Sequence, residues 1–283
     1  RGIRDVDFAW ADSLYYASKY RHARVLRDEF NLRLKHGFQV ELLEPEALQE
    51  NYRIDAPAAI LSHQAARIDP YRMAYRLLAR LEKRGSPVFD RTHIAEFHAT
   101  SRSVTLRTEG GQTIRANHVV LAAGYANQHW LKQKVAQNRS SYAFISYPIE
   151  TDTLGPLKDT MVWESARPYL YMRSTGDGRL LIGGEDDSVD VPARRDACVE
   201  KKARILHRKV TKLFPHLPLQ LAFAWAGTFA ETRDGLPFFG SHAQHGPRIH
   251  FAMAYGGNGI TYSMLGADLL RALIERRRHP LAA

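Results

Sequence analysis

Apolar residues recur every three to four positions in several segments of the chain, a spacing that predicts amphipathic helices. These segments span residues 18–38, 44–52, 68–89, 193–215 and 259–280. Gly37 stops the first predicted helix, and Pro280 follows the last one, which is largely apolar as far as Glu275.

The segment 68–89 carries the strongest helix signal. Asp69 can accept hydrogen bonds from the first turn, Pro70 suits the first helical position, and Gly85 ends the helix. The predicted apolar face consists of Met73, Leu77, Leu78 and Leu81.

Short apolar or alternating runs between these helices predict strands. Candidate strands span residues 103–108, 112–116, 118–124, 141–151, 168–175, 178–186, 221–232 and 248–256. The run 118–124 ends in small residues, which predicts a buried parallel strand whose end approaches a ligand. Helices and strands alternate at both ends of the chain around an antiparallel middle. We therefore expect an α/β (α+β) protein with two interleaved domains.

Composition narrows the class of protein. The chain has 283 residues, 45% of them hydrophobic and 25% charged, which is typical of a globular protein with ample core. No run approaches the roughly 18 apolar residues of a membrane span, and no secretory signal lies near the start. The single cysteine, Cys198, excludes an internal disulfide and a multi-cysteine metal site, so we expect a reducing, cytoplasmic location.

The formal net charge of +10 leaves two interpretations, a solvated basic surface or a polyanionic partner. The basic residues are scattered over separate segments, so we do not expect nucleic acid as a partner. The 13 histidines show no metal-ligand spacing, and we expect no metal.

The stretch 255–261, YGGNGIT, places glycines directly before the last predicted helix. Glycine permits positive φ and close backbone approach, and Asn258 can cap the helix. Such a turn presents backbone amides to an electron-rich group. From these residues alone, an ordinary glycine-rich turn stays an alternative. No strand followed by GxGxxG occurs anywhere in the chain.

Five strings, taken in order, resemble the FAD-dependent oxidoreductases of the D-amino-acid oxidase superfamily, in particular its glycine/sarcosine oxidase-like members. They are ARIDPYRMAYRLL, TIRANHVVLAAGY, PYLYMRSTGDGRLLIGGEDD, WAGTFAETRDGLPFFG and FAMAYGGNGITYS. The resemblance implies an incomplete FAD-binding Rossmann-like domain interleaved with an antiparallel-sheet substrate domain. These proteins open with a GxGxxG segment that holds the FAD pyrophosphate, so the resemblance also implies that this chain lacks that segment and has poor affinity for FAD.

The resemblance divides the chain into four segments. Residues 1–63 are expected to form substrate-domain helices and a linker, and 64–135 part of the FAD-binding domain. Residues 136–232 are expected to form the antiparallel-sheet substrate domain, and 233–283 the C-terminal part of the FAD-binding domain.

The resemblance also implies a set of contacts to FAD. The turn 255–261 corresponds to the flavin-ring contact, 122–124 to a strand end beside FAD, 232–235 to a turn near the flavin, and Ile94 to an adenine contact. Gly227 stands where some members have the cysteine that attaches FAD, which implies a non-covalent cofactor. The implied cofactor-binding residues are Ile94, Ala122, Ala123, Gly124, Asp234, Gly256, Gly257, Asn258, Gly259, Ile260 and Thr261.

The substrate side departs from the family pattern. Phe229 occupies the position of an arginine that clamps the substrate carboxylate in some members. Arg173 is a candidate replacement, on one face of a predicted strand with Tyr169 and Tyr171, and a solvent-facing sheet surface is the alternative. Leu181 stands where related oxidases have a lysine that promotes reaction with oxygen, so the electron acceptor stays open. The candidate catalytic residues, all assigned to substrate positioning, are Tyr171, Arg173 and Tyr255.

We therefore expect an enzyme that oxidises a C–N bond of a small amine or amino-acid-like substrate by hydride transfer to flavin N5. Two alternatives stay open. The chain is an inactive truncated fragment that folds without FAD, or it is an oxidase domain acting on amines attached to tRNA.

Overall fold

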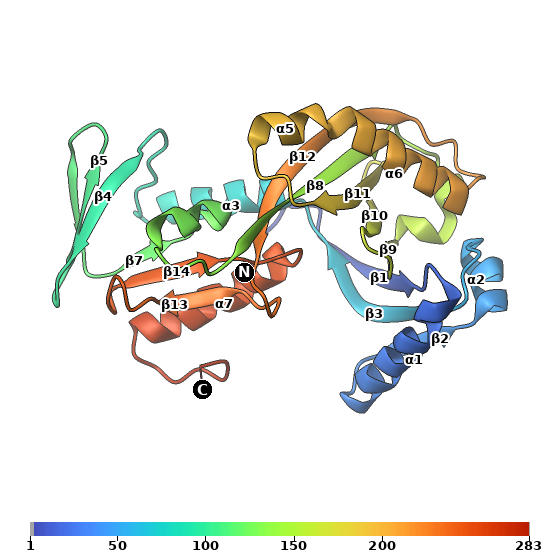
Figure 1. Cartoon of the computed structure of the whole chain (residues 1–283), viewed down its shortest axis with the longest axis horizontal. Helices are drawn as coiled ribbons and strands as arrows, with labels where there is room; N and C mark the ends of the chain where they lie inside the picture. Colours follow the sequence, from blue (N-terminus) through green and yellow to red (C-terminus); the bar gives the residue numbers. More distant parts are fainter. Residues whose placement is uncertain (1–2, 283) are drawn as a thin grey trace. The chain divides into compact units, whose positions relative to one another are not determined.

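The computed structural model describes residues 3–282, and the chain divides into two compact units, each built from two separate stretches of sequence (Figure 1). Unit 1 comprises Arg1–Leu77 and Ser140–Gly227, and unit 2 comprises Leu78–Arg139 and Thr228–Ala283. The interleaved α/β organisation predicted from the sequence is confirmed. The chain changes unit at 77/78, 139/140 and 227/228, where the sequence predicted 63/64, 135/136 and 232/233.

Unit 1 is built on an eight-stranded sheet in the order β12-β8-β11-β10-β9-β1-β3-β2. Its strands are β1 (Ala9–Tyr16), β2 (Val40–Leu43), β3 (Ala59–Arg67), β8 (Gln137–Ser146), β9 (Thr160–Glu164), β10 (Leu170–Ser174), β11 (Leu180–Asp187) and β12 (Leu221–Glu231). β1 runs parallel to β9 and antiparallel to β3, while β11 is antiparallel to both β10 and β8. The antiparallel middle of the chain is therefore as the alternating runs predicted.

Two helices of unit 1 cover opposite faces of this sheet (Figure 1). The apolar stripe of α6 (Val199–Leu213) is buried with Ala59 and Leu61 of β3. The apolar stripe of α1 (Tyr20–Lys35) is buried with Ala58 and Ile60, the residues that alternate with them. The remaining helices of unit 1 are short: α2 (Pro45–Tyr52), α4 (Thr151–Leu154), η2 (Gly155–Lys158) and α5 (Pro192–Ala197).

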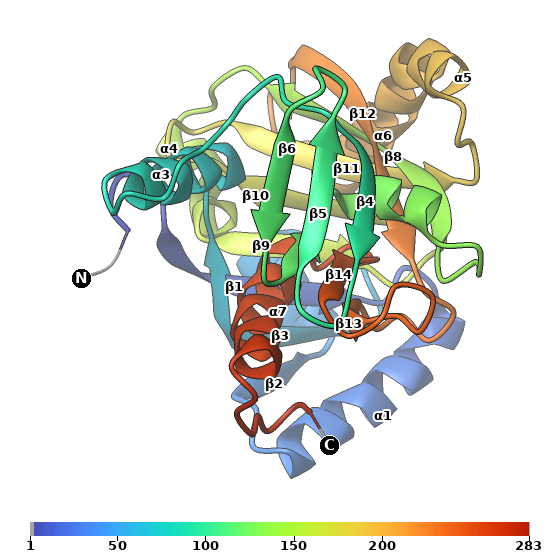
Figure 2. The same cartoon turned by 90° about the vertical axis from the view of Figure 1, so that its left-hand side faces the viewer.

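Unit 2 contains two three-stranded sheets, one of which faces the viewer in Figure 2. That sheet is β4 (Ile94–Ala99), β5 (Val104–Thr108) and β6 (Thr113–Ala116), and the other has the order β13 (Phe238–Ser241), β14 (Ile249–Met253), β7 (Val119–Leu121). The last helix, α7 (Gly259–Ile274), packs on β13: a Cβ at Gly266 would come within 2.1 Å of the Phe239 ring. The short helix η1 (Gly124–Trp130) follows β7.

Several sequence expectations were wrong in detail. Segment 1–63, expected to be helices and a linker, also contains β1, β2 and the start of β3. The run 118–124 is a parallel strand, but β7 lies at a sheet edge, and Val120 is 42% exposed rather than buried. The predicted helix 193–215 is divided between α5 and α6 at Cys198.

The segment 68–89 forms α3 (Pro70–Glu82), which begins as predicted, because the backbone N–H of Arg72 donates to Asp69 Oδ1 at 3.0 Å. No side chain of α3 is buried in the described chain, although its leucines were expected to form a core face. An amphipathic pattern predicts which face of a helix is apolar, but it does not supply the surface that covers that face.

Candidate active site

The carboxyl ends of two parallel strands lie side by side at one edge of the β13-β14-β7 sheet of unit 2. β7 pairs with β14 in parallel, with Leu121 opposite Phe251. The predicted contacts Ala122, Ala123 and Gly124 follow β7, and the glycine turn follows β14. The carboxyl ends of parallel strands are where α/β proteins bind their ligands. The fold thus brings these two predicted cofactor segments to the same edge.

A buried asparagine joins the two strand ends. Asn127 in η1 has no exposed surface, and its Nδ2 donates to the carbonyl oxygens of Leu121 at 2.8 Å and Ala252 at 3.1 Å. Its Oδ1 accepts the backbone N–H of Ala123 at 3.3 Å. Buried amides satisfied in this way fix local geometry. Sequence reasoning missed Asn127, although a polar residue three positions after the small residues of AAG was the available signal.

The glycine turn places bare backbone before α7. Gly256 has φ +56° and donates its N–H to the Ala230 carbonyl at 2.9 Å. A Cβ added at Gly256 or Gly259 would meet nothing within 4 Å, so the backbone there borders open space. Asn258 occupies the N-cap position, but its side chain makes no capping bond, contrary to expectation. The first turn of α7, which includes Ile260 and Thr261, contains no acidic residue, so its positive dipole end is not neutralised there.

The backbone just before this turn is constrained. Ala254 is buried with φ +62°, a conformation that costs a residue with a Cβ about 1 kcal/mol or more. The backbone of Tyr255 forms an isolated antiparallel β-bridge with that of Glu231. The Tyr255 hydroxyl donates a hydrogen bond to the Ala252 carbonyl at 2.9 Å. Burial raises the pKa of Tyr255 above its ordinary value, so its hydroxyl stays protonated at neutral pH.

The two other predicted cofactor contacts lie elsewhere in unit 2. Ile94 opens β4 and packs against the buried cluster of that unit. Asp234 lies in an exposed turn, where Oδ1 accepts the Thr232 hydroxyl at 2.8 Å and the Leu236 N–H at 3.1 Å. These bonds lower the pKa of the Asp234 carboxyl. The turn lines a cleft of about 750 Å³ together with residues such as Lys134 and His242.

In unit 1, Tyr171 and Arg173 lie on the face of β10 that is turned away from α6. Leu170 and Met172, which alternate with them, are buried in the cluster that α6 covers. The Tyr169 and Tyr171 rings are 5.8 Å apart between centroids. The predicted shared face is therefore present. The third candidate catalytic residue, Tyr255, belongs to unit 2.

The guanidinium of Arg173 is half-buried and has no close carboxylate partner among the described residues. Its Nη1 donates to the Ser174 carbonyl at 3.1 Å, and within the described residues it forms no ion pair closer than 4 Å. Burial lowers the pKa of its guanidinium, an effect that the charges of Asp7 and Asp69 partly oppose. Guanidinium nevertheless stays charged in proteins, so Arg173 is available to a carboxylate.

Residues 3–282 contain no group of three or more His, Cys, Asp or Glu side chains placed to hold a metal ion. Among the same residues, no helix is both long and apolar enough to cross a bilayer.

Parallel strand ends, a glycine turn and an unneutralised helix N-terminus are typical of α/β proteins that bind a nucleotide cofactor. A family model described as FAD dependent oxidoreductase (DAO) matches residues 1–273. The chain belongs to that family, and FAD is the cofactor of the family.

Glycine oxidases are among the proteins that this chain is similar to. It is 27% identical to the glycine oxidase of Geobacillus kaustophilus (strain HTA426) over 83% of the chain and 62% of the relative. Identity to the glycine oxidase of Bacillus subtilis (strain 168) is 25%, over 74% of the chain and 55% of the relative. The chain thus spans less than two thirds of the length of these relatives. A crystal structure of glycine oxidase from Geobacillus kaustophilus shares the fold, with a TM-score of 0.83, 21% identity, and coverage of 98% of this chain and 74% of that one.

The residues at the sheet edge of unit 2 fit one end of FAD. Gly124 and Gly256 both have positive φ with nothing within 4 Å of an added Cβ, so a flat ring can approach the backbone there. The first turn of α7 contains no acidic residue, so its amides suit electron-rich atoms of such a ring. The amino-acid sequence contains no GxGxxG motif of the kind that suits a pyrophosphate.

Proposed function

We propose that the protein is an FAD-dependent oxidase or dehydrogenase that oxidises a C–N bond of a small amine or amino-acid substrate. The observation that carries this proposal is the family match over residues 1–273, combined with the open glycine turn at the N-terminus of α7. The similarity to glycine oxidases supports an amino-acid substrate.

FAD, when bound, supplies the redox chemistry by accepting a hydride from the substrate carbon, which leaves an imine for hydrolysis. The chain's own residues bind and orient. The amides of Gly259, Ile260 and Thr261 would stabilise negative charge on the ring edge by about 0.3–1 kcal/mol. The backbone of Ala122, Ala123, Gly124, Gly256 and Gly257 allows close approach, while Ile94 and Asp234 are proposed as contacts farther along the cofactor.

Arg173 is proposed to hold the substrate carboxylate in place of the arginine that Phe229 replaces. Its planar guanidinium can form two parallel hydrogen bonds to a carboxylate, and its half-buried position strengthens them. Tyr171 and Tyr255 are proposed to border the substrate. Both hydroxyls are protonated at neutral pH, because burial raises their pKa values. Tyr171 can donate a hydrogen bond to substrate, whereas Tyr255 donates its proton to the Ala252 carbonyl and can accept a hydrogen bond from a substrate amine.

We also propose that FAD is held without a covalent bond. Cys198 is the single cysteine of the chain and lies between α5 and α6 of unit 1. Denaturing the yellow protein with acid should release all of the flavin into the supernatant, and flavin that stays with the precipitate would contradict this part of the proposal.

The function is tested by adding excess FAD to the purified protein without oxygen and recording the visible flavin band, because a chain without the GxGxxG turn is expected to hold FAD weakly. A band that bleaches when glycine or another amino acid is added, and that does not bleach when the protein is left out, is the expected result. A protein that leaves the spectrum of the added FAD unchanged instead supports a chain that folds without FAD. A coloured protein that no amine or amino acid bleaches contradicts the proposed reaction.

A further inference from the structure

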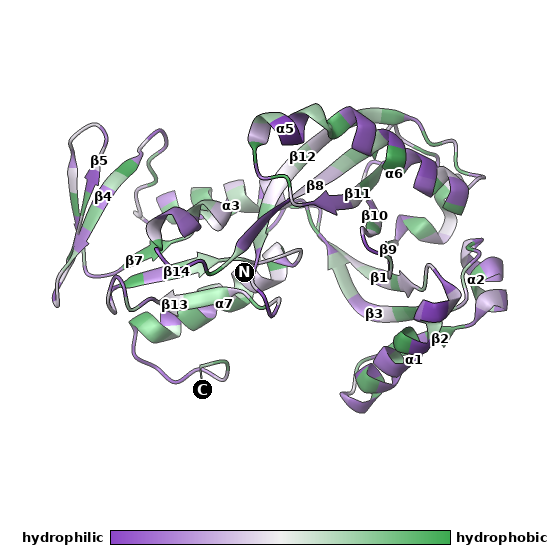
Figure 3. Ribbon diagram, in the orientation of Figure 1, coloured by the Kyte–Doolittle hydropathy of each residue, from purple (hydrophilic) through white to green (hydrophobic). Residues whose placement is uncertain are grey.

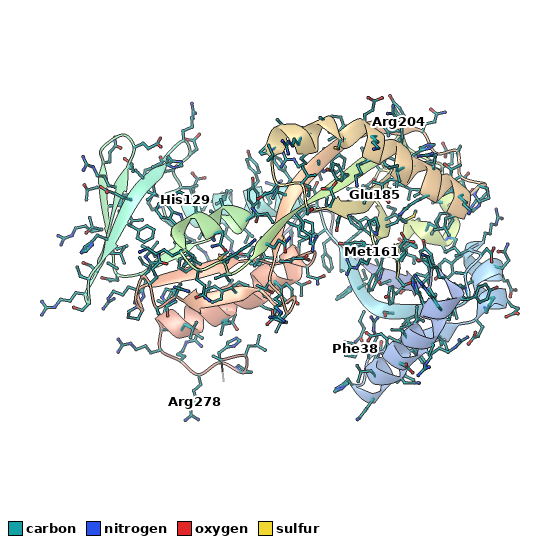
Figure 4. The ribbon with its side chains drawn as sticks, in the orientation of Figure 1. Phe38, His129, Met161, Glu185, Arg204 and Arg278 are labelled. Carbon is teal, nitrogen blue, oxygen red and sulfur yellow. The ribbon has the colours of Figure 1, made fainter. Side chains whose placement is uncertain are left out.

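The face of the unit 1 sheet opposite α6 is covered by α1 at the end formed by β1, β3 and β2. This face carries two rows of side chains, defined by strand register. The first row runs Tyr15, Trp163, Tyr171, Gly183, Ala143 across β1, β9, β10, β11 and β8. The second row contains Ser13 and Met161 at one end and Arg173, Leu181 and Ile145 at the other. Met161 is labelled in Figure 4. Arg173 is the one charged residue in these two rows.

Within the first row, Trp163 leans toward β1. Its indole Nε1 donates to Ser13 Oγ at 3.0 Å, and its ring stacks on Tyr15 with centroids 3.9 Å apart and planes 18° apart. Tyr15 in turn packs against the cluster beneath α1. The indole therefore has a fixed direction, set by one hydrogen bond and one stacked ring.

Tyr171, the neighbour of Trp163 in the row, leans the other way. A Cβ added at Gly183 would lie 2.4 Å from the Tyr171 hydroxyl oxygen, so the phenol ring crosses the bare backbone of β11. Any larger residue at 183 would push this ring off its position. Gly183 thus holds Tyr171 by leaving room for it.

Because the two adjacent rings lean apart, neither covers the strip of sheet between β9 and β10. We call this strip, bounded by Trp163, Tyr171, Met161 and Arg173, the aromatic strip. Its walls are apolar or aromatic apart from the half-buried guanidinium of Arg173, on which the charges of Asp7, Arg67 and Asp69 also act. A ligand suited to these groups carries a carboxylate and an apolar group larger than a hydrogen atom.

We propose that the aromatic strip binds the substrate's apolar side chain while Arg173 binds its carboxylate, so that the substrate is an amino acid with a bulky apolar side chain rather than glycine. Trp163 is the specificity-determining residue, and Gly183 and Ser13 are positioning residues that act through Tyr171 and Trp163. The inference rests on the proposed function for the reaction, but it concerns binding that the chain can perform without FAD.

The test is isothermal titration calorimetry of the full chain, without FAD, against phenylacetate, acetate and 2-phenylethanol. Phenylacetate should bind at least about tenfold more tightly than acetate, because burial of the phenyl group adds to the ion pair. The indole N–H resonance of Trp163, identified by its loss in Trp163→Phe, should shift in the NMR spectrum on binding. Equal affinity for phenylacetate and acetate, absent binding, or an unmoved indole resonance would overturn the inference.

Variants separate the roles. Arg173→Gln should weaken the binding of both carboxylates about tenfold and leave the affinity for 2-phenylethanol unchanged. Trp163→Ala should reduce the affinity for phenylacetate to that for acetate. Gly183→Ala should weaken phenylacetate about tenfold, but it should have no further effect in a Tyr171→Ala background. Gly227→Ala is the matched control, because a Cβ there meets nothing within 4 Å. Normal binding by a folded Gly183→Ala variant would remove Gly183 from the proposal, with circular dichroism confirming the fold.

The inference and the proposed function can fail separately. The chain could bind phenylacetate while no amino acid reduces its FAD. That result would support the binding site and contradict the proposed reaction. Reduction of FAD by glycine as readily as by phenylalanine, in a chain that does not discriminate phenylacetate from acetate, would keep the reaction and reject the site.

Discussion

The two units differ in how completely they bury their apolar residues. In unit 1, α6 closes one face of the sheet, with its own Leu206 and the strand residue Phe144 both fully buried. In unit 2, α7 is apolar over most of its surface (Figure 3), and Ile260, Met264 and Leu265 are 45%, 55% and 46% exposed. In the same unit, β7 is the edge strand of its sheet and pairs only with β14 among the described strands. Unit 1 therefore closes one face of its sheet with its own helix, whereas unit 2 has a smaller buried cluster and joins the ends of β7 and β14 through the polar bonds of Asn127.

The largest contrast is expected from core truncation. Phe144→Ala should destabilise the protein by about 3–5 kcal/mol, because it leaves a cavity in a closed core. Met264→Ala on α7 is the paired change and should cost less than about 0.5 kcal/mol, since its side chain is mostly exposed. Urea denaturation followed by circular dichroism measures both. Equal losses in the two variants would break the comparison.

Asn127→Ala should have the next largest effect. It would leave the carbonyls of Leu121 and Ala252 and the N–H of Ala123 without their partner, at a cost of about 1–3 kcal/mol. Hydrogen exchange should accelerate at β7 and β14 but not in the unit 1 sheet, and FAD binding should weaken. Asn117→Ala, at an exposed position, serves as the control. Unchanged exchange at both strands would show that Asn127 does not hold the edge.

A smaller effect is expected from the glycine turn. Gly256→Ala should cost about 1 kcal/mol, because its φ of +56° strains any residue with a Cβ, although nothing nearby clashes. Ala254→Gly should stabilise by up to about 1 kcal/mol, since Ala254 already bears such strain. Thermal unfolding compares the pair. The same sign for both substitutions would contradict a conformational origin.

The smallest predicted effect is a difference in pH response between the units. In unit 2, burial lowers the pKa values of His118 and His250, whose Nδ1 and Nε2 atoms are 3.2 Å apart, and Arg248 and Arg276 add to the effect on His118. A lowered folded-state pKa gives stability that is present above the unfolded value of 6.5 and is lost as pH falls through the folded pKa.

In unit 1 the sign is reversed. Hydrogen bonds to Glu41 and then Asp12 raise the pKa of the exposed His63. Its contribution is fully present below 6.5 and is lost as pH rises through the raised value. Hydrogen exchange at pH 5 and pH 8 should therefore show β14 loosening in acid, whereas β2 and β3 loosen slightly at higher pH. His250→Gln and His63→Gln should remove the respective responses.

Much of this fold follows from sequence patterns because the signals are local. Asp69 and Pro70 mark the start of α3, and Gly37 follows the C-cap residue of α1. Alternation places Leu170 and Met172 on the face of β10 opposite Tyr171 and Arg173. The glycine turn and the strand end before Gly124 were predicted as parts of one site, and the structure brings them to one sheet edge.

The sequence did not predict features that depend on distant pairing. The strand β1 is recognisable only beside β3 and β9, because its apolar positions do not alternate cleanly. The bonds of Asn127 reach Ala252, 125 positions away. The opposed directions of Trp163 and Tyr171 depend on Ser13 and Tyr15 of β1 and on Gly183 of β11, which lie far from them in the sequence. A local window contains none of these partners.

The interleaving of the two units also bears on how the chain emerges from the ribosome. Ser13 in β1 binds Trp163 in β9, 150 residues later, and unit 1 is complete only when Gly227 has been synthesised. At about 5–20 residues per second, β1 waits many seconds without its parallel partner. Contacts of such long range slow folding and keep strand edges unpaired during translation. The same connectivity means that neither unit can be cut out as one continuous piece of polypeptide.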